Sequence, residues 1–289
     1  MKIAIVGAGG FVGKEFIRHL SNNHYVLPLT HSDLDITNVQ EVRRIIFNQR
    51  PALIINCAVL GVDACELNPS LAWSVNVSGA ENLAGAAAAI DAEFLHLSTN
   101  YVFDGNRERG SFYTLADTPT PINVYGRTKL AGEQAVRVVS PKCFIIRTSW
   151  VFGVGKENFF STALRSLNAA KKICAITDVW ASATYVRDLV ARAIEILFHH
   201  HYSTYHVVNN GLCSYYDFAL EAACMFKMSN EELEQLIEPV KLFEFRHNAA
   251  RPRYTPMRCT VSEEIGLAPL RDWRTALAEC IHDNGCLNQ

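Results

Sequence analysis

Short apolar runs alternate with segments of helical periodicity along the first half of the chain. The apolar runs predict strands at 2–6, 25–29, 53–56, 93–97 and 143–147. Apolar residues recur with a helical period at positions 11, 12, 16, 17 and 20. Further helices are predicted at 38–49, with Thr37 as its cap, and at 69–90. Because the strands are apolar throughout rather than alternating, they indicate a parallel sheet covered by helices on both faces.

The second half of the chain has a less regular pattern. It predicts helices at 186–199, 215–225 and 272–281 and strands at 204–208 and 240–245. A long loop is predicted earlier in the chain, at 104–121. We therefore predict an α/β fold, in which a doubly wound parallel-sheet Rossmann-type domain is joined to a smaller α/β substrate-binding domain. The first domain is assigned to 1–150 and about 175–208, and the second to about 151–174 and 209–289.

Composition narrows the classes of function. Of 289 residues, 49% are hydrophobic and 19% charged, and the net charge of −2 argues against nucleic acid or an anionic membrane as the main partner. The longest nearly apolar stretch, at 83–90, is too short to cross a bilayer. Nine cysteines without a C-x-x-C pair indicate small buried side chains in a reducing cytosol. The N-terminus shows no signal-peptide pattern, so a cytoplasmic location is expected.

A glycine-rich turn joins the first predicted strand to the first predicted helix. Gly7, Gly10 and Gly13 form a G-x-x-G-x-x-G pattern, with Phe11 and Val12 inside it. Gly7 can make the tight turn, Gly10 lets a pyrophosphate approach the backbone, and Gly13 lets the helix pack close to the sheet. The turn is therefore predicted to hold the diphosphate of a dinucleotide at the helix N-terminus.

The end of the second predicted strand bears on the choice of nicotinamide cofactor. No acidic residue stands where one would hold a ribose 2′-hydroxyl, and Asp33 lies slightly beyond that point. Thr30, His31 and Ser32 can all donate to a 2′-phosphate. NADP(H) is therefore favoured, with NAD(H) as the alternative. Asp35 is placed either to contact the adenine or to cap the next helix.

Tyr125 and Lys129, four residues apart, would share one face of a helix. A phenol is a poor acid or base at neutral pH because its ordinary pKa is about 10, and a nearby ammonium lowers that pKa. Such a pair can pass a proton to or from a carbinol oxygen. Ser98 and Thr99 follow the fourth predicted strand, at the edge where α/β sheets bind ligands, and a hydroxyl there can bond the same oxygen.

Seven segments of the chain resemble the extended short-chain dehydrogenases/reductases, and specifically the dTDP-4-dehydrorhamnose reductase family. They are GAGGFVG (7–13), LDIT (34–37), VNVSGAENLA (75–84), STNYVFDG (98–105), YGRTKLAGE (125–133), RTSWVFG (147–153) and ARPRYTPM (250–257). The resemblance implies that Tyr125 is the proton donor and that Thr99 orients the substrate carbonyl. It also implies that Lys129 lowers the pKa of Tyr125 and holds the nicotinamide ribose.

The resemblance further implies which residues contact the ligands. Cofactor contacts beyond those named above are assigned to Ile36, Cys57 and Ala58. Substrate contacts are assigned to Asn100, Val102, Trp150, Asn158 and Arg251. Arg251 suits a nucleotide diphosphate. The alternatives are that Trp150 fills the core, and that Arg251 is a surface cation while Arg253 makes the phosphate contact.

The chain departs from the family pattern at four places where the sugar would lie. Asn100 replaces Asp, Leu115 replaces Glu, Ala181 and Ala183 replace Gly and Pro, and the loop after Asn56 is one residue shorter. These departures leave reductase chemistry intact. They leave open which keto-sugar and which nucleotide the protein uses.

The predicted function is NADPH-dependent reduction of the 4-keto group of a nucleotide-linked 4-keto-6-deoxysugar. One alternative is an epimerase or dehydratase of the same superfamily; another is a cofactor-binding regulatory subunit resembling that of methionine adenosyltransferase. The expected partner is the nucleotide-sugar, without nucleic acid or membrane, and a homodimer is left open. The three histidines at 199–201 are interpreted as a polar helix end, and no metal ligand is assigned.

Overall fold

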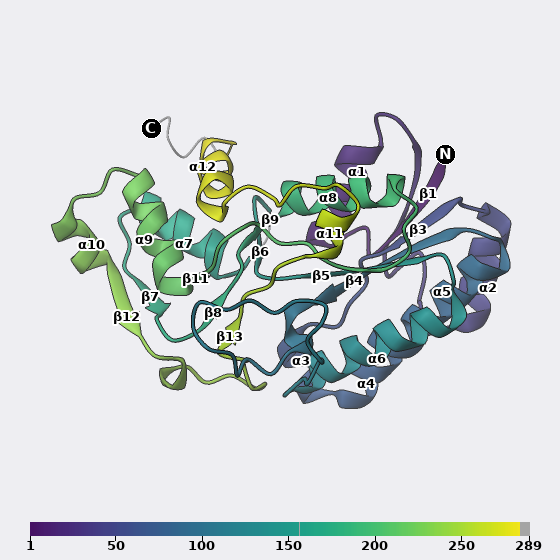
Figure 1. Ribbon diagram of the computed structural model, residues 1–289, viewed down its shortest axis with the longest axis horizontal. Coiled ribbons are helices and arrows are strands. Elements are labelled where there is room, and N and C mark those ends of the chain that lie inside the picture. Colours follow the sequence, from purple (N-terminus) through teal and green to yellow (C-terminus); the bar gives the residue numbers. More distant parts are fainter. Residues whose placement is uncertain (156, 284–289) are drawn as a thin grey trace.

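The computed structural model describes residues 1–155 and 157–283 and confirms the α/β fold (Figure 1). Six parallel strands form the central sheet in the order β10-β5-β4-β3-β1-β2. Their bounds are Lys2–Val6 (β1), Tyr25–Leu29 (β2), Leu53–Asn56 (β3), Glu93–Thr99 (β4), Cys143–Thr148 (β5) and Thr204–His206 (β10). The strand order reverses between β1 and β3, so ligands are expected at the carboxyl ends of these strands.

Alternate residues of the central strands face two separate hydrophobic cores. On one face, Ile3 and Ile5 of β1 pack with α1 (Phe11–Leu20) and α8 (Val186–Phe198). On the other face, Ala4 and Val6 pack with residues of two further helices, α2 (Val39–Gln49) and α5 (Ala80–Ala89). α6 (Val124–Val139) lies beside α5 on this second face (Figure 1). Burial on both faces explains why these strands are apolar throughout.

The second half of the chain adds small sheets beside the central one. One sheet joins β11 (Cys213–Ser214), β8 (Trp180–Ala181) and β13 (Tyr254–Thr255); the others pair β12 (Ile237–Val240) with β7 (Ile173–Ile176), and β6 (Val151–Phe152) with β9 (Thr184–Tyr185). A third core lies among these strands and the helices α7 (Phe159–Asn168), α9 (Tyr215–Met225) and α12 (Trp273–Asp283). Strand pairing thus groups 173–181 with the C-terminal part of the chain. The domain boundaries stay a prediction, and 284–289 lie outside the described residues.

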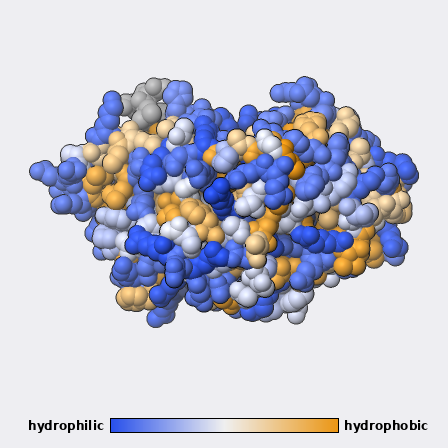
Figure 2. Space-filling view, in the orientation of Figure 1, coloured by the Kyte–Doolittle hydropathy of each residue, from blue (hydrophilic) through white to orange (hydrophobic). Residues whose placement is uncertain are grey.

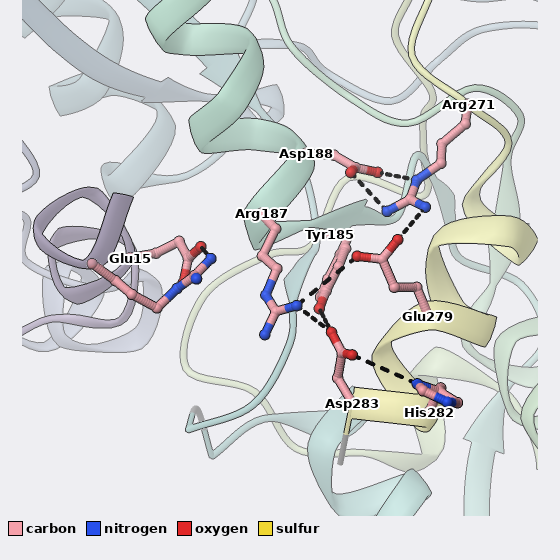
Figure 3. Close-up of polar contacts among 9 residues, drawn as sticks. Glu15, Tyr185, Arg187, Asp188, Arg271, Glu279, His282 and Asp283 are labelled. Atoms are coloured by element: carbon pink, nitrogen blue, oxygen red, sulfur yellow. Dashed lines mark hydrogen bonds and ion pairs between the residues drawn. The ribbon is translucent and has the colours of Figure 1, made fainter. Parts of the chain in front are cut away.

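An ion-pair network joins α12 to α8 and so fastens the third core to the central sheet (Figure 3). Arg271 donates from Nε and Nη2 to the two carboxylate oxygens of Asp188, at 2.8 Å each, and also pairs with Glu279. Arg187 pairs with Asp283 at the end of α12. The hydrogen bonds to Asp188 raise the pKa of Arg271, so its charge persists at any physiological pH.

The predicted helix at 69–90 is continuous but not uniform. α4 (Pro69–Trp73) and α5 flank a π-helical turn at Ser74–Gly79. This turn carries the buried Asn76, whose Oδ1 accepts the Leu60 N–H at 2.9 Å and whose Nδ2 donates to the Thr128 hydroxyl at 3.1 Å. The wider turn therefore links the loop after β3 to α6, and π-turns often lie at functional sites.

Two predictions at the ends of elements are wrong. Asn38 rather than Thr37 caps α2, because its side chain accepts the N–H groups of Gln40 and Glu41. The strand predicted at 240–245 instead lies at β12, which ends at Val240, and Leu242–Glu244 forms a 3-10 turn. The remaining helices are α3 (Val62–Leu67), a 3-10 turn at Asn100–Val102, α10 (Asn230–Leu236) and α11 (Val261–Glu264).

The surface is mostly polar, with smaller apolar patches scattered over the face shown in Figure 2. Among the helices of the described residues, none is both long and apolar enough to cross a membrane. The cysteines within 1–155 and 157–283 form no disulfide.

Candidate active site

The glycine turn between β1 and α1 leaves space only for backbone. Gly7 has φ +77°, and a Cβ there would lie 2.7 Å from the backbone nitrogen of Ala58. A Cβ on Gly13 would lie 2.4 Å from the carbonyl oxygen of Gly7. Gly10 is the N-cap of α1, and no side chain of the described residues caps this end of the helix. The turn therefore fits a bound diphosphate, which takes the backbone N–H groups of such a helix end as donors.

Four further predicted cofactor residues lie around this turn. Phe11 and Val12 open α1 and pack against the third core. Cys57 and Ala58 lie directly against Gly7, and the Cys57 N–H donates to the carbonyl oxygen of Val6 at 2.9 Å. The structure thus brings the loop after β3 to the edge where the predicted diphosphate site lies.

The segment after β2 is arranged around Asp33. The Asp33 carboxylate accepts the Thr30 N–H at 2.9 Å and the Thr30 hydroxyl at 2.6 Å, and the Ser32 hydroxyl lies 2.8 Å from the Thr30 hydroxyl. These hydrogen bonds from Thr30 lower the pKa of Asp33. The Thr30 hydroxyl therefore donates to Asp33, and the Ser32 hydroxyl donates to the Thr30 oxygen in this arrangement. The contacts of Thr30, His31 and Ser32 with a 2′-phosphate stay predictions.

Asp35 forms a local turn rather than a helix cap. Its carboxylate accepts the Thr37 N–H at 2.9 Å and the Thr37 hydroxyl at 2.8 Å, which lowers the pKa of Asp35. Since Asn38 caps α2, the alternative that Asp35 caps this helix is wrong. Ile36 is buried and would be 2.6 Å from a Cβ on Gly79. The contacts of Asp35 and Ile36 with the cofactor stay predictions.

Two of the three predicted catalytic residues, Thr99 and Tyr125, come together where β4 ends and α6 begins. Asn123 caps α6 by accepting the Gly126 N–H at 2.7 Å, which sets the start of the helix that carries Tyr125 and Lys129. Burial raises the pKa of Tyr125, while a hydrogen bond with Thr99 lowers it, and the net change is upward. The phenol therefore keeps its proton through the physiological pH range. A protonated phenol next to a hydroxyl can donate a proton to a substrate oxygen.

Lys129 is directed away from the expected interaction with Tyr125. Its Nζ donates to the carbonyl oxygen of Leu97 at 2.6 Å and lies 3.1 Å from Nε2 of His96. Burial lowers the pKa of Lys129 to about 8. The shift in the pKa of Tyr125 comes from burial, Thr99 and two neighbouring groups, and Lys129 is not among its causes. The lowering of the phenol pKa by Lys129 is thus absent from this arrangement of the described residues.

Two predicted substrate residues on the 3-10 turn after β4 are both buried, but in different surroundings. The side chain of Asn100 is buried, and its Nδ2 donates to the Thr255 hydroxyl at 2.7 Å. Val102 is fully buried in a hydrophobic cluster with Phe103 and Tyr113. A substrate contact by the side chain of Val102 does not fit this position, because the cluster encloses it.

Trp150 lies at the boundary between the site and the third core. It has φ +41°, which is a strained value for a tryptophan, and its ring stacks on Tyr215 at 4.0 Å between centroids. The side chain is half-buried, so one part of the ring packs and another part remains accessible. Asn158 caps α7, and its Nδ2 donates to the carbonyl oxygen of Val151 at 3.2 Å. The substrate roles of Trp150 and Asn158 stay predictions.

Arg251 faces inward rather than forming an isolated surface cation. Its Nη2 pairs with Asp63 of α3, and its Nη1 is buried with no hydrogen-bond partner among the described residues. Burial raises the pKa values of Tyr101 and Tyr215, and the charge of Arg251 opposes that rise at both phenols. An unsatisfied guanidinium nitrogen whose charge reaches two phenols fits an anionic ligand such as a nucleotide diphosphate.

Several residues around the site were not found by sequence reasoning. Tyr101 lies edge-on to Tyr125, with 5.6 Å between ring centroids. It stands inside the STNYVFDG segment, so its position there was an available signal. Tyr215, Asp63 and His96 come from distant parts of the chain, and no local pattern places them.

The three histidines after α8 have separate partners. His199 caps α8, His200 binds Glu93 through Nδ1 at 2.7 Å, and the Nδ1 of His201 lies 2.8 Å from the Tyr205 hydroxyl. Within the part of the chain that the structure describes, no three metal-binding side chains form a cluster suited to an ion.

Comparisons with known proteins agree with this geometry. The family model described as "RmlD substrate binding domain" matches residues 1–286. A dTDP-4-dehydrorhamnose reductase of Mycolicibacterium smegmatis is 38% identical over 284 residues, covering 97% of this chain and 85% of that protein. A solved dTDP-4-dehydrorhamnose reductase of Clostridium acetobutylicum has a TM-score of 0.91 at 35% identity, with 98% of this chain and 99% of that chain covered. One of Bacillus anthracis, in complex with NADP, has a TM-score of 0.91 at 34% identity and the same coverage. The resemblance seen in the sequence is thus confirmed, and the chain belongs to the RmlD substrate-binding-domain family.

Proposed function

We propose that this protein reduces the 4-keto group of a nucleotide-linked 4-keto-6-deoxysugar with NADPH, as a step in deoxysugar biosynthesis. One observation carries the proposal: Thr99 and a protonated Tyr125 meet at the carboxyl edge of a sheet whose first turn fits a dinucleotide. The relatives supply the substrate class, since they are named dTDP-4-dehydrorhamnose reductases.

Residues of this chain fit the nicotinamide cofactor. Gly7, Gly10 and Gly13 would line the diphosphate, because their lack of side chains lets it approach the backbone. The start of α1, which has no side-chain cap, faces it with backbone N–H groups. His31 and Ser32 would contact the 2′-phosphate of NADP(H). When bound, the cofactor supplies the hydride that reduces the ketone carbon. The assignment to NADP(H) is supported by the Bacillus anthracis relative, which was solved with NADP.

The protein's own groups supply the proton. Thr99 donates a hydrogen bond to the substrate carbonyl and holds it beside the Tyr125 hydroxyl. As the carbonyl carbon is reduced, its oxygen gains negative charge and takes the proton of Tyr125. Because the pKa of Tyr125 is raised, the phenol begins the reaction protonated, as a proton donor must.

The nucleotide diphosphate is assigned to Arg251, with Trp150 and Tyr215 as aromatic walls. The unpartnered Nη1 supports the contact, since a buried guanidinium N–H group needs an acceptor and a phosphate oxygen would supply one. The family's usual Asp is replaced by Asn100, which removes a negative charge from the sugar site. The names of the relatives, rather than this substitution, support dTDP-4-dehydrorhamnose or a close 4-keto relative as the sugar.

The two alternatives make different demands on the site. An epimerase must oxidise and then re-reduce, and so retains its cofactor as tightly held NAD. A purely regulatory subunit has no need for Thr99 next to Tyr125, and this placement disfavours it. The homodimer and the cytoplasmic location stay predictions.

A panel of nucleotide-linked 4-keto-6-deoxysugars, each mixed with enzyme and NADPH, tests the proposed function. NADPH consumption should be fastest with dTDP-4-dehydrorhamnose or a close relative. Interconversion of sugars without net NADPH consumption would identify an epimerase. Binding of NADPH without turnover of any sugar in the panel would favour the regulatory alternative.

Cofactor preference tests the assignment of His31 and Ser32. We expect the unmodified protein to bind NADPH more tightly than NADH, and Ser32→Asp to reverse this order, because the new carboxylate repels the 2′-phosphate. Asp33→Asn is the matched variant: it removes a charge from the same turn and should tighten NADPH binding while leaving NADH binding nearly unchanged. Fluorescence titration measures these dissociation constants. Tighter binding of NADH by the unmodified protein would make the assignment wrong.

The contact of Arg251 with the diphosphate is expected to appear mainly in KM. The diphosphate is remote from the ketone, so it helps the ground state and the transition state about equally. A charge-assisted hydrogen bond contributes about 1.5–3 kcal/mol, so Arg251→Ala should raise KM for the nucleotide-sugar roughly 10- to 150-fold, with kcat and NADPH affinity nearly unchanged. Steady-state kinetics of Arg251→Ala and Arg253→Ala separate the two candidates. A rise in KM only for Arg253→Ala would move the contact by two positions.

A further inference from the structure

One buried side chain fastens the segment that carries Arg251 to the first turn of α6. Asn123 is 1% exposed, and its amide oxygen and amide nitrogen bond to different parts of the chain. Its Oδ1 accepts the Gly126 N–H at 2.7 Å and so caps α6, while its Nδ2 donates to the carbonyl oxygen of Ala250 at 2.7 Å. Asn123 is therefore bonded both to the helix that carries Tyr125 and to the residue before Arg251.

The chemistry of an asparagine is required for this pair of hydrogen bonds. Both partners are backbone groups: the Gly126 N–H can only donate, and the Ala250 carbonyl can only accept. A serine at position 123 would supply the acceptor for the cap but has no second polar atom, and an ionised aspartate has a second atom that only accepts. Asn123 thus does more than a helix cap needs.

Helix α3, which lies beside α6, holds the same two segments by its carboxylates (Figure 1). Asp63 pairs with the guanidinium of Arg251, and its Oδ1 accepts the Ala249 N–H at 3.2 Å. Three residues further along α3, Oε2 of Glu66 accepts the Val124 N–H at 3.0 Å. The start of α6 and the segment 249–251 are therefore fixed relative to each other directly, by Asn123, and through α3.

The two segments are also closely packed on their other sides. A Cβ on Gly126 would clash with the carbonyl oxygen of Tyr101, so the first turn of α6 lies against the backbone that follows β4. Beyond Arg251, the carbonyl oxygen of Arg253 accepts the Trp180 N–H at 2.7 Å. The backbone on both sides of Arg251 is thus bonded to neighbouring elements, which limits how far this side chain can move.

A nucleotide-sugar bound as proposed above would reach from Arg251, at its diphosphate, to Tyr125, at its ketone. These residues come from opposite halves of the chain, so their separation depends on the contacts between the two segments. We propose that Asn123 is a positioning residue that sets the place of the diphosphate contact relative to the proton donor. The catalytic part of this inference rests on the proposed function, whereas the fixing of 249–251 by Asn123 does not.

Amide hydrogen exchange of the full-length protein, followed by NMR, tests the fixing of 249–251. Asn123→Ser keeps a cap on α6 but removes the donor to the Ala250 carbonyl. We expect the Ala249 N–H to exchange roughly 2- to 12-fold faster, the effect of losing one hydrogen bond, while the amides of α6 keep their rates. Unchanged exchange at Ala249, or an equal acceleration throughout α6, would overturn the proposal.

Steady-state kinetics with NADPH and dTDP-4-dehydrorhamnose test the catalytic part. Asn123→Ser should raise KM roughly 5- to 50-fold, a part of the rise expected of Arg251→Ala, with kcat nearly unchanged because the cap still holds Tyr125. In the double variant Asn123→Ser/Arg251→Ala, KM should not rise further than in Arg251→Ala, since both changes act through one contact. A merely structural role would multiply KM by the same factor in both backgrounds, and that result would overturn the proposal.

Two more variants separate the bridge from the cap. Asn123→Asp keeps the shape and the cap but places an acceptor against the Ala250 carbonyl, so its rise in KM should be at least that of Asn123→Ser. Asn38→Ser is the matched control, because Asn38 caps α2 through the same kind of hydrogen bond, and it should change neither KM nor kcat. A normal KM in Asn123→Asp, or an equal rise in Asn38→Ser, would contradict the proposal.

The two readouts distinguish this inference from the proposed function. Faster exchange at Ala249 in Asn123→Ser, without turnover of any sugar by the unmodified protein, would support the fixing of 249–251 and count against the proposed function alone. Normal turnover with unchanged exchange and unchanged KM in Asn123→Ser would count against the role of Asn123 alone.

Discussion

Tyr125→Phe should lower kcat about 10²- to 10⁴-fold, because it removes the proton donor and keeps the ring. Dissociation constants for NADPH should change little, since the glycine turn is built from other residues. The raised pKa of Tyr125 predicts that the unmodified enzyme keeps its proton donor throughout the neutral range. Steady-state and single-turnover kinetics with NADPH measure the loss.

Tyr101→Phe is the matched control, since this phenol lies edge-on to Tyr125 in the same site. It should affect kcat far less than Tyr125→Phe. A Tyr125→Phe enzyme with near-normal kcat would remove Tyr125 from the mechanism. An equal loss from both variants would show that neither phenol is uniquely the proton donor.

Breaking the buried ion pair between α6 and β5 should produce the largest loss of stability. Arg147 binds both carboxylate oxygens of Glu133, and the side chains of Arg147 and Glu133 are 7% and 2% exposed. Ser98 of β4 also donates to Glu133. Glu133→Gln leaves the guanidinium buried without its counter-charge. Removing one partner of such a pair costs about 3–5 kcal/mol, and we expect the free energy of unfolding to fall by that amount.

Chemical denaturation measures this loss, and two further variants interpret it. The double change Glu133→Met/Arg147→Met should recover most of the stability, because apolar groups can replace a buried pair at little cost. Arg165→Ala, which breaks an exposed pair with Glu157, should leave the unfolding free energy nearly unchanged. A Glu133→Gln protein as stable as the unmodified one would show that this pair does not hold α6 in place.

Local patterns predicted the parts of the fold that depend on neighbouring residues. The first strand, the glycine turn and α1 were predicted at their observed bounds, because apolar runs, glycine spacing and helical periodicity act over a few residues. The cap at Asn38 and the 3-10 turn at Leu242–Glu244 were missed, since side-chain hydrogen bonds decide such ends.

The site was predictable only where a motif carries it. Tyr125, Lys129 and Thr99 belong to recognisable segments, but the partners that set their protonation do not. His96 precedes Lys129 by 33 residues, and Arg251 meets Asp63 from 188 residues away. Val102 lies in a predicted motif, yet the fold turns its side chain into the core. Such pairings follow from the packing of α6 and the C-terminal loop against the sheet, which spacing does not reveal.

The fate of the hydride tests the reductase assignment most directly. Enzyme, NADPH carrying two deuterium atoms at C4 of the nicotinamide, and dTDP-4-dehydrorhamnose are incubated, and the sugar product is examined by NMR. The account predicts one deuterium bound to C4 of the sugar, a new hydroxyl on that carbon and one NADP formed per product. A product without deuterium at C4, or an isomerised sugar formed without consumption of NADPH, would contradict it.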